Sequence, residues 1–382
     1  MSPVSKKEYV QAIAKRYHGA SRDEKSRILD ECCRICGYHR KHAIAKLSQG
    51  QRSTRVRRKP GRTSRYRRPE IMAVLQCIWQ TAHYPCSKRL KAILPIWLEP
   101  YQHTFGGLPG WVKQALATIS PSTIDRVLTQ ERLRVKRRGL STTKPGTLLK
   151  HQIPIKTNQW DETRPGFLEA DTVAHCGDSM AGQFVFTLDV TDIATGWTEQ
   201  RAVWGKGERG VLEQIVSIEA SLPFAIRGFD CDNGTEFIQW HLVRYFQERP
   251  APVQFTRSRP YKKDDNAHVE QKNWTHVRQW LGYQRFEKSI LVERLNELYT
   301  TEWRLFHNFF LPSAKLLNKQ RVRSKIIKQH DRPKTPYQRV LESEHLPQDT
   351  KDKLTACYNT LNPFALRQAL DEKIRRIKQL AR

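Results

Sequence analysis

The sequence predicts a mixed α/β domain flanked by helical regions, and three observations support this fold class. Residues 166–287 contain short runs that alternate apolar and polar positions, separated in the second half by stretches with helical periodicity. Residues 5–48 and 70–140 show helical periodicity with capping signals, and helical periodicity returns after residue 287. At 382 residues, the chain is long enough for several domains and at least one large core.

The charge of the chain indicates a polyanionic partner. Lys and Arg number 67 against 38 Asp and Glu, which gives a formal net charge of +29. Nucleic acid is the commonest partner of such a chain, and a membrane surface is the alternative. No apolar run approaches the roughly 18 residues of a spanning helix, and the N-terminus lacks the apolar segment of a signal peptide. We therefore expect a DNA partner and no membrane partner.

Residues 1–50 predict an N-terminal helix-turn-helix domain. The first helix is expected over 6–19, the second begins with the capping box Ser21–Glu24 and ends near Gly37, and the third covers 38–47. A Gly-containing turn followed by a basic helix is typical of DNA-binding helix-turn-helix domains, although a plain three-helix bundle has the same pattern.

Four potential zinc ligands lie within this domain, namely Cys33, Cys36, His39 and His42. A closed zinc site usually takes its second pair of ligands from an element a dozen or more residues away, which this spacing does not provide. Buried thiols on one helix and exposed histidines on the next are the favoured alternative. We expect all eight cysteines to be reduced, because a chain with no export signal belongs to a reducing compartment.

Residues 51–69 predict an extended basic linker. The segment has nine basic residues and no acidic one, so it cannot form a core. Its charges should bind DNA phosphates almost regardless of sequence, and a solvated spacer is the alternative. The candidate DNA contacts are Arg52, Arg55, Arg57, Arg58, Lys59, Arg62, Arg65, Arg67 and Arg68.

Residues 70–140 predict a second helix-turn-helix DNA-binding domain. Helical segments are expected over 69–82, 86–97 and 120–138, and the last has Ser120 at the N-cap and a proline at the first turn. The exposed side of this last helix offers Arg126, Gln130 and Arg132 for contact with bases and phosphates. A solvated basic face would have the same sequence.

Residues 160–287 predict a five-stranded mixed sheet. Strands are expected over 166–175, 182–192, 196–205, 225–234 and 251–258, and helices over 207–223, 238–249 and 266–286. Three strands joined by tight turns, followed by two strands joined through helices, define such a sheet, with the first and fourth strands adjacent. Residues 288–382 predict a C-terminal helical basic region. A basic connector is expected over 318–336, and the last helix buries a stripe through Leu366, Leu370, Ile374 and Ile377.

Acidic residues occur in pairs on two of these strands. Glu169 and Asp171 share one face of the first strand, and Asp230 and Asp232 share one face of the fourth. We favour Asp171 and Asp232 as functional members, because sites on such sheets open at the carboxyl ends of the strands; the other member of each pair is the alternative. Asp189 and Asp192 are interpreted as turn residues.

At this point the sequence resembles a known family. The segments EADT around Asp171, CDNGTEF around Asp232 and NAHVEQKN around Glu270 are similar to the catalytic acids of retroviral integrases and bacterial insertion-sequence DDE transposases. The resemblance implies a ribonuclease-H-like core. Thirty-seven residues separate Asp232 from Glu270, slightly more than in the retroviral enzymes, and Asp264 and Asp265 are the fallback acids.

The resemblance implies a DNA transposase that binds the ends of its mobile element, cleaves them and joins the 3′-hydroxyl ends to target DNA. Asp171, Asp232 and Glu270 would hold two Mg²⁺ ions, for which Mn²⁺ could substitute. The protein would act on double-stranded DNA in the bacterial cytoplasm at the nucleoid, as a homodimer or larger assembly. Asn273 could orient Glu270, and the cations expected near bound DNA are Lys262, Lys263, Lys272, His276 and Arg278.

Two other functions are compatible with the same sequence. A nuclease of the ribonuclease-H superfamily would cut DNA without strand transfer. A catalytically silent DNA-binding regulator would need only the basic and helical regions, and it gains support if any of the three acids cannot bind metal.

Overall fold

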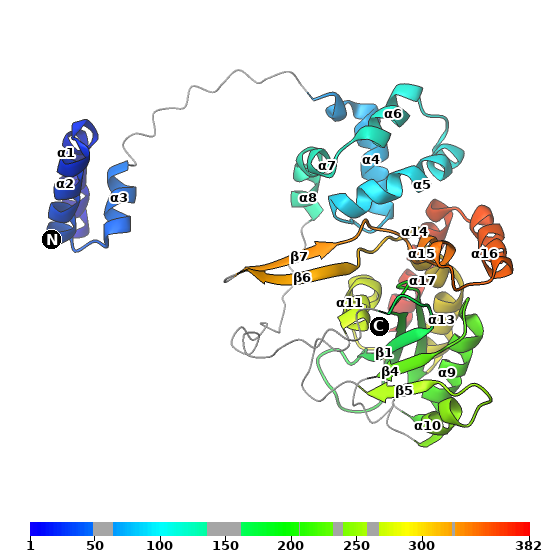
Figure 1. Cartoon of the computed structure of the whole chain (residues 1–382). Helices are drawn as coiled ribbons and strands as arrows, with labels where there is room; N and C mark the ends of the chain where they lie inside the picture. Colours follow the sequence, from blue (N-terminus) through cyan, green and yellow to red (C-terminus); the bar gives the residue numbers. More distant parts are fainter. Residues whose placement is uncertain (49–63, 136–161, 206, 232–239, 258–266, 323–324) are drawn as a thin grey trace. The chain divides into compact units, whose positions relative to one another are not determined.

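The computed structural model describes residues 1–48, 64–135, 162–205, 207–231, 240–257, 267–322 and 325–382 (Figure 1). These residues form two compact units, Met1–Arg65 and Tyr66–Arg382. Asp232, which ends the predicted fourth strand, lies outside the described residues.

The first unit packs three helices, at the positions where the sequence predicted helices. Its helices are α1 (Pro3–Gly19), α2 (Arg22–Cys36) and α3 (Arg40–Ser48). The capping box is confirmed, since the Ser21 side chain accepts from the Glu24 N–H and the Glu24 side chain accepts from the Ser21 N–H. Gly37 ends α2 with φ of 65°, a left-handed conformation that favours glycine. The small core is formed by Val10, Ile13, Ile28, Leu29, Cys32, Cys36, Ala43 and Leu47.

The second unit is built on a five-stranded mixed sheet with strand order β3-β2-β1-β4-β5. Its strands are β1 (Phe167–Ala174), β2 (Val185–Asp192), β3 (Thr198–Trp204), β4 (Gly228–Cys231) and β5 (Gln254–Arg257). β1 is antiparallel to β2 and parallel to β4, so the predicted adjacency of the first and fourth strands is confirmed. The mixed α/β class is confirmed with it.

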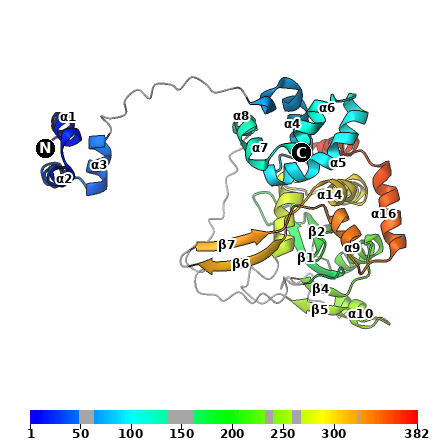
Figure 2. The same ribbon diagram turned by 45° about the horizontal axis from the view of Figure 1, so that its top comes forward.

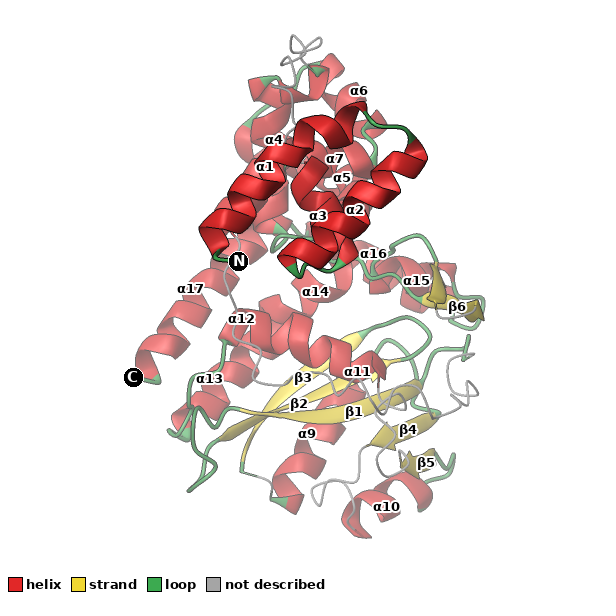
Figure 3. Ribbon diagram, turned by 90° about the vertical axis from the view of Figure 1, so that its left-hand side faces the viewer, coloured by secondary structure: helices red, strands yellow, loops and turns green. Residues whose placement is uncertain are grey.

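Helices cover both faces of this sheet (Figure 3). On one face lies α9 (Glu208–Ser221), where Arg201 of β3 donates to Ser217 Oγ over 3.0 Å. The other face carries one helical run made of α11 (Ala267–Lys272), the π-helical segment η4 (Asn273–Arg278) and α12 (Gln279–Leu281). The helix α10 (Trp240–Gln247) leads from β4 toward β5. The face covered by α11, η4 and α12 is the one that bears Asp171 and Asp189.

Two asparagines cover the outer edge of β3. The Asn308 carboxamide accepts from the Thr198 N–H and donates to the Thr198 carbonyl, each over 2.9 Å. Asn296 makes the same pair of bonds to Ala202 over 2.7 and 3.0 Å. These side chains supply the bonds of a missing sixth strand, so the edge is closed to pairing with another chain.

The remaining helices of this unit share one hydrophobic core with the sheet. They are α4 (Pro69–Thr81), α5 (Ser87–Phe105), α6 (Gly110–Thr118), α7 (Pro121–Val127), α8 (Thr129–Val135), α13 (Ile290–Leu298), the π-helical η5 (Tyr299–Trp303), α14 (Arg304–Phe310), α15 (Pro336–Glu342), α16 (Gln348–Thr360) and α17 (Pro363–Leu380). Figure 2 shows α17 beside α4 and α5, far from it in the sequence. Trp97 of α5 donates its indole N–H to the Phe310 carbonyl over 3.3 Å. None of the helices among the described residues has the length and apolar character to cross a membrane.

The basic segment 318–336, predicted to be a connector between helices, contains regular structure. The strands β6 (Leu316–Val322) and β7 (Lys325–His330) form an antiparallel hairpin that projects from the helices (Figure 1). The segment shows no sustained alternation of apolar and polar residues, and the side chains that the structure describes between Leu317 and His330 are exposed. The stripe on α17 is confirmed as core, since Leu370, Ile374 and Ile377 are buried.

Two core histidines should each contribute a loss of stability as pH decreases below about 6.5, because the folded chain holds them neutral. Burial lowers the pKa of His175 and of His307 to about 3. In the unfolded chain, histidine titrates near pH 6.5, so the unfolded state binds more protons between these values. Each histidine should therefore remove up to about 1.4 kcal/mol of unfolding free energy per pH unit. Urea unfolding at several pH values measures this slope. The variant His175→Gln should flatten it, and a change at the exposed His345 should leave it unchanged.

Candidate functional site

The predicted acids Asp171 and Glu270 come from neighbouring elements. Asp171 lies in β1, is half-buried and stands opposite Asp189 of β2. Glu270 lies on α11, which packs across β1 and β2, and its side chain is exposed. Asp232 follows Cys231, the last residue of β4, but lies outside the described residues, as do the fallback acids Asp264 and Asp265.

Asn273 connects the helix to the strand at this site. Its Nδ2 donates to Asp171 Oδ2 over 2.6 Å, and the Thr172 N–H donates to Asp171 Oδ1 over 2.7 Å. Residues three apart on a helix lie on the same side, so Glu270 and Asn273 share the side that faces Asp171. The prediction that Asn273 orients Glu270 needs correction, because its bond is to Asp171. Both Asp171 oxygens are thus held in place by hydrogen bonds.

Glu169, the alternative to Asp171, holds the start of α11. It is 2% exposed, and its Oε2 accepts from the backbone N–H groups of His268 and Val269 over 3.0 and 3.1 Å. Burial raises the Glu169 pKa to about 8, although both N–H donors act in the opposite direction. Glu169 therefore fixes the position of the helix that carries Glu270.

Asp230, the alternative to Asp232, is also buried in the sheet. It is 1% exposed and pairs in register with Glu169 across β4 and β1. Its Oδ1 accepts from Thr256 Oγ1 of β5 over 2.7 Å. A carboxylate in this position ties the two parallel strands together, one step behind the end of β4.

Asp189 is not a turn residue, which corrects the sequence-based interpretation. It lies inside β2 with no exposed surface, and Gln200 Nε2 of β3 donates to its Oδ1 over 3.1 Å. Burial raises the Asp189 pKa to about 8, while the Lys272 ammonium acts in the opposite direction. Asp192 is a turn residue as predicted, because its carboxylate accepts from both the N–H and the hydroxyl of Thr195.

Lys272 and His276 are also corrected, since neither is a surface cation. They are only 6% and 7% exposed, and Lys272 Nζ lies 3.4 Å from His276 Nε2. Burial lowers the Lys272 pKa to about 7 and the His276 pKa well below its usual value. Lys272 is the last residue of α11, whereas His276 lies in the π-helical segment η4, whose wider turn shifts side chains away from the positions of a regular α-helix.

The structure describes some of the other predicted DNA-contacting residues but not all of them. Arg126 and Gln130 are exposed, and Arg132 forms an ion pair with Asp125. Arg278 is half-buried and donates to the Ala174 carbonyl over 2.6 Å. Arg65, Arg67 and Arg68 are exposed around a short 3-10 helix, Arg65–Arg67. Outside the description lie Arg52, Arg55, Arg57, Arg58, Lys59, Arg62, Lys262 and Lys263.

Within the described ranges, no group of three or more His, Cys, Asp or Glu side chains is placed to hold a metal ion. Of the three ligands predicted for the sheet site, Asp171 and Glu270 are among the described residues. All four candidate zinc ligands of the first unit are described: Cys36 is buried in the core, Cys33 is half-buried, and His39 and His42 are exposed on the following segment.

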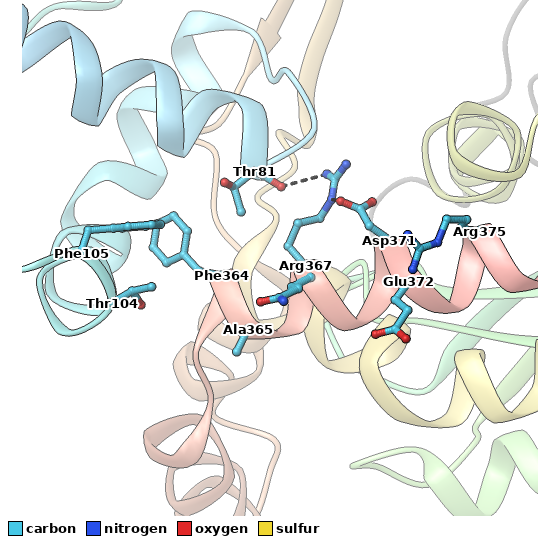
Figure 4. Close-up of a pocket in the computed structure, with 10 residues that line it drawn as sticks. Thr81, Thr104, Phe105, Phe364, Ala365, Arg367, Asp371, Glu372 and Arg375 are labelled. Atoms are coloured by element: carbon cyan, nitrogen blue, oxygen red, sulfur yellow. Dashed lines mark hydrogen bonds and ion pairs between the residues drawn. The ribbon is translucent and has the colours of Figure 1, made fainter.

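A hollow of about 680 Å³ lies apart from these acids, where α17 passes the ends of α4 and α5 (Figure 4). Its wall combines the Arg367 and Arg375 cations with the Asp371 and Glu372 carboxylates. Arg367 donates to the Thr81 carbonyl over 3.0 Å and to Asp371 over 2.8 Å. The positive and negative charges of the hollow balance, and Arg367 links α17 to the end of α4. We therefore interpret this hollow as a packing feature of the α4–α17 contact.

Comparison with known proteins places the chain in a family. No protein-family model matches the sequence. The chain is 36% identical over 343 residues to "Uncharacterized protein y4rM" of Sinorhizobium fredii (strain NBRC 101917 / NGR234), which covers 89% of this chain and 96% of the relative. Identity at this level over nearly the whole of both chains shows that this protein belongs to the y4rM family.

Proposed function

We propose that this protein is a DDE-type DNA transposase with a ribonuclease-H-like core. It would bind the ends of a mobile element, cleave them and join the 3′-hydroxyl ends to target DNA, as a dimer or larger assembly at the nucleoid. The observation that carries the proposal is the 2.6 Å bond from Asn273 to Asp171. That bond brings the side of the helix bearing Glu270 to the strand bearing Asp171, beside the end of β4.

The strand order adds support. A sheet ordered β3-β2-β1-β4-β5, with only β2 antiparallel to both of its neighbours, is the arrangement that the resemblance to integrases implies. β1 and β4 run parallel and adjacent, so their carboxyl ends meet at one edge of the sheet. Asp171 lies toward this end of β1, and Asp232 is the residue after β4.

The donor set fits magnesium, which prefers carboxylate oxygens. Asp171, Asp232 and Glu270 would hold two ions, and bound Mg²⁺ would stabilise charge on the attacking and leaving oxygens of a phosphodiester. The chain's own contribution is orientation. Asn273 and the Thr172 N–H fix the Asp171 carboxylate, while Glu169 anchors the N-terminus of α11.

The proposal is tested with the full chain, Mg²⁺ and labelled duplexes that carry the DNA flanking its gene on both sides. Nicked ends and strands joined to a target plasmid are expected, and their sequencing identifies the junctions. Cleavage without joined products would favour a nuclease instead. Specific binding without any cleavage, in Mg²⁺ and in Mn²⁺, would favour a silent regulator and overturn the proposal.

The variant Asn273→Ala should lower cleavage by about 10- to 100-fold, because groups that orient a metal ligand typically contribute that much. Asp171 would lose the donor that fixes Oδ2 while keeping its charge. The midpoint of Mn²⁺ activation should rise correspondingly, which separates an effect on metal binding from a general loss of structure. Thr275→Ala, on the same helical run but bonded only to its own segment, is the matched control.

A further inference from the structure

The hairpin β6–β7 is anchored firmly at its base. A bridge joins Ser313 to Lys334 through two backbone bonds of 3.0 and 3.1 Å. The Asp331 carboxylate accepts from the Lys315 N–H and from the Arg339 guanidinium, each over 2.7 Å. Lys315 in turn donates to the Ala194 carbonyl over 2.7 Å, at the turn between β2 and β3. The base is therefore fixed to the sheet domain.

Beyond this base the hairpin forms a two-stranded ribbon that extends away from the helices and the sheet (Figures 1 and 2). Its strands pair in antiparallel register, with Asn318 opposite Gln329 and Gln320 opposite Ile327. Opposed residues share a face, as do residues two apart along a strand. Among the side chains that the structure describes, one face of the ribbon thus combines three carboxamides and an isoleucine; we call Asn318, Gln320, Ile327 and Gln329 the amide face.

The amide face is solvent-exposed and makes no side-chain hydrogen bonds among the described residues. All four side chains are exposed, including 55% of Ile327. Leu317, at the irregularity near the start of β6, is 64% exposed. An isolated two-stranded ribbon with exposed aliphatic side chains has only marginal stability in water. A partner that offers both hydrogen-bonding groups and apolar contact would stabilise such a surface most.

The charge of the ribbon identifies the class of partner. Residues 316–330 include five Lys and Arg residues and no acidic residue. Lys328 is exposed on the face opposite the amide face. A ribbon that combines basic residues with a row of carboxamides matches a duplex, which presents phosphates at the rim of a groove and base edges at its floor.

We infer that the β6–β7 ribbon enters the major groove of duplex DNA with its amide face toward the bases. The major groove admits a two-stranded ribbon, and carboxamides of Asn and Gln bind adenine edges there in a bidentate manner. Alternate residues along a strand are about 7 Å apart, close to two base-pair steps of about 3.4 Å. Ile327 would contact a thymine methyl group. This inference rests on the proposed function for its DNA partner and adds a sequence-reading element to it.

The test uses the full chain and a pool of duplexes with 20 randomised base pairs, from which bound molecules are recovered and sequenced. The wild type should enrich a motif with adenine-rich positions. The amide-face variant Asn318→Ala/Gln320→Ala/Gln329→Ala should lose those positions from its motif. Its affinity for the wild-type motif should fall at least about 10-fold, since each bidentate base contact contributes roughly 1–3 kcal/mol of discrimination. Its affinity for unselected duplex should change less than about twofold.

Lys328→Ala is the matched control, on the same ribbon but on the opposite face. Because that face points away from the bases, this variant should leave the motif unaltered, and any loss of affinity should be equal for all sequences. A duplex with 5-iodouracil in the motif carries its reactive group in the major groove. Irradiation should cross-link it to a peptide within residues 316–330.

Three outcomes would overturn the inference. An unchanged motif in the amide-face variant, with an intact fold by circular dichroism, removes the base-reading role while leaving the transposase proposal in place. Loss of self-association with DNA binding unchanged would assign the ribbon to a second copy of the chain. If the wild-type chain binds no duplex from the pool, the inference and the proposed function fall together.

Discussion

The variant Asp171→Asn should abolish DNA cleavage and joining while leaving the fold and DNA binding intact. Asparagine keeps the size of the side chain and one oxygen to accept from Asn273, but removes the charge that would hold a metal ion. A loss on the order of 10³-fold or more is expected, because ligands of a two-metal site act as a unit. Gel analysis of labelled end duplexes in Mg²⁺ measures both products. Asp232→Asn and Glu270→Gln should have the same effect.

Asp230→Asn is the internal control for this series. The side chain is buried behind the end of β4, where one remaining oxygen can still accept from Thr256. Most activity should therefore survive. If Asp230→Asn abolished joining while Asp232→Asn retained it, the second ligand would be misassigned. If all four variants stayed active, the transposase proposal would be wrong.

Much of the sheet could be predicted because its signals are local. The strands with period-two alternation, β1 to β3, are found within three residues of their predicted ends. The capping box at Ser21 and the N-cap at Ser120 were readable for the same reason, since each cap is a contact between residues three apart.

The environment of the acids could not be predicted in the same way, because it depends on distant contacts. Asp189 was expected in a turn, yet its partners are Gln200 and a lysine more than 80 residues away. The one indication in the sequence that Asp189 lies inside the strand was its place between the apolar residues Leu188 and Val190. The π-helical segment that contains the buried His276 leaves no periodic trace in the sequence.

The β6–β7 ribbon shows a further limit of predicting structure from sequence patterns. Hydrophobic periodicity reports which face of an element packs against a core, and the side chains that the structure describes between Leu317 and His330 are exposed. A basic stretch without periodicity resembles a linker whether or not its backbone pairs. The bonds that define its base, from Asp331 to Lys315 and Arg339, join residues 16 and 8 positions apart.

A second large effect is expected at a charge cluster inside the sheet. Glu199 of β3 has no exposed surface, and its carboxylate accepts from the Trp197 indole and the Arg304 guanidinium, each over 3.0 Å. Arg201, 1% exposed, lies 3.4 Å from the same carboxylate. Burial alone would lower the Arg201 pKa, and the Glu199 charge opposes that effect. The carboxylate therefore compensates a guanidinium that cannot reach water.

Replacing Glu199 with alanine should lower the free energy of unfolding by about 3–5 kcal/mol, because it leaves the Arg201 charge buried and unpaired. Urea unfolding followed by tryptophan fluorescence measures the change. The double variant Glu199→Ala/Arg201→Met should recover a substantial part of the loss, since an apolar side chain removes the uncompensated charge. Glu372→Ala breaks the exposed pair with Arg376 and should change stability little. If Glu199→Ala were as stable as Glu372→Ala, or if adding Arg201→Met made it still less stable, charge compensation would not be the role of Glu199.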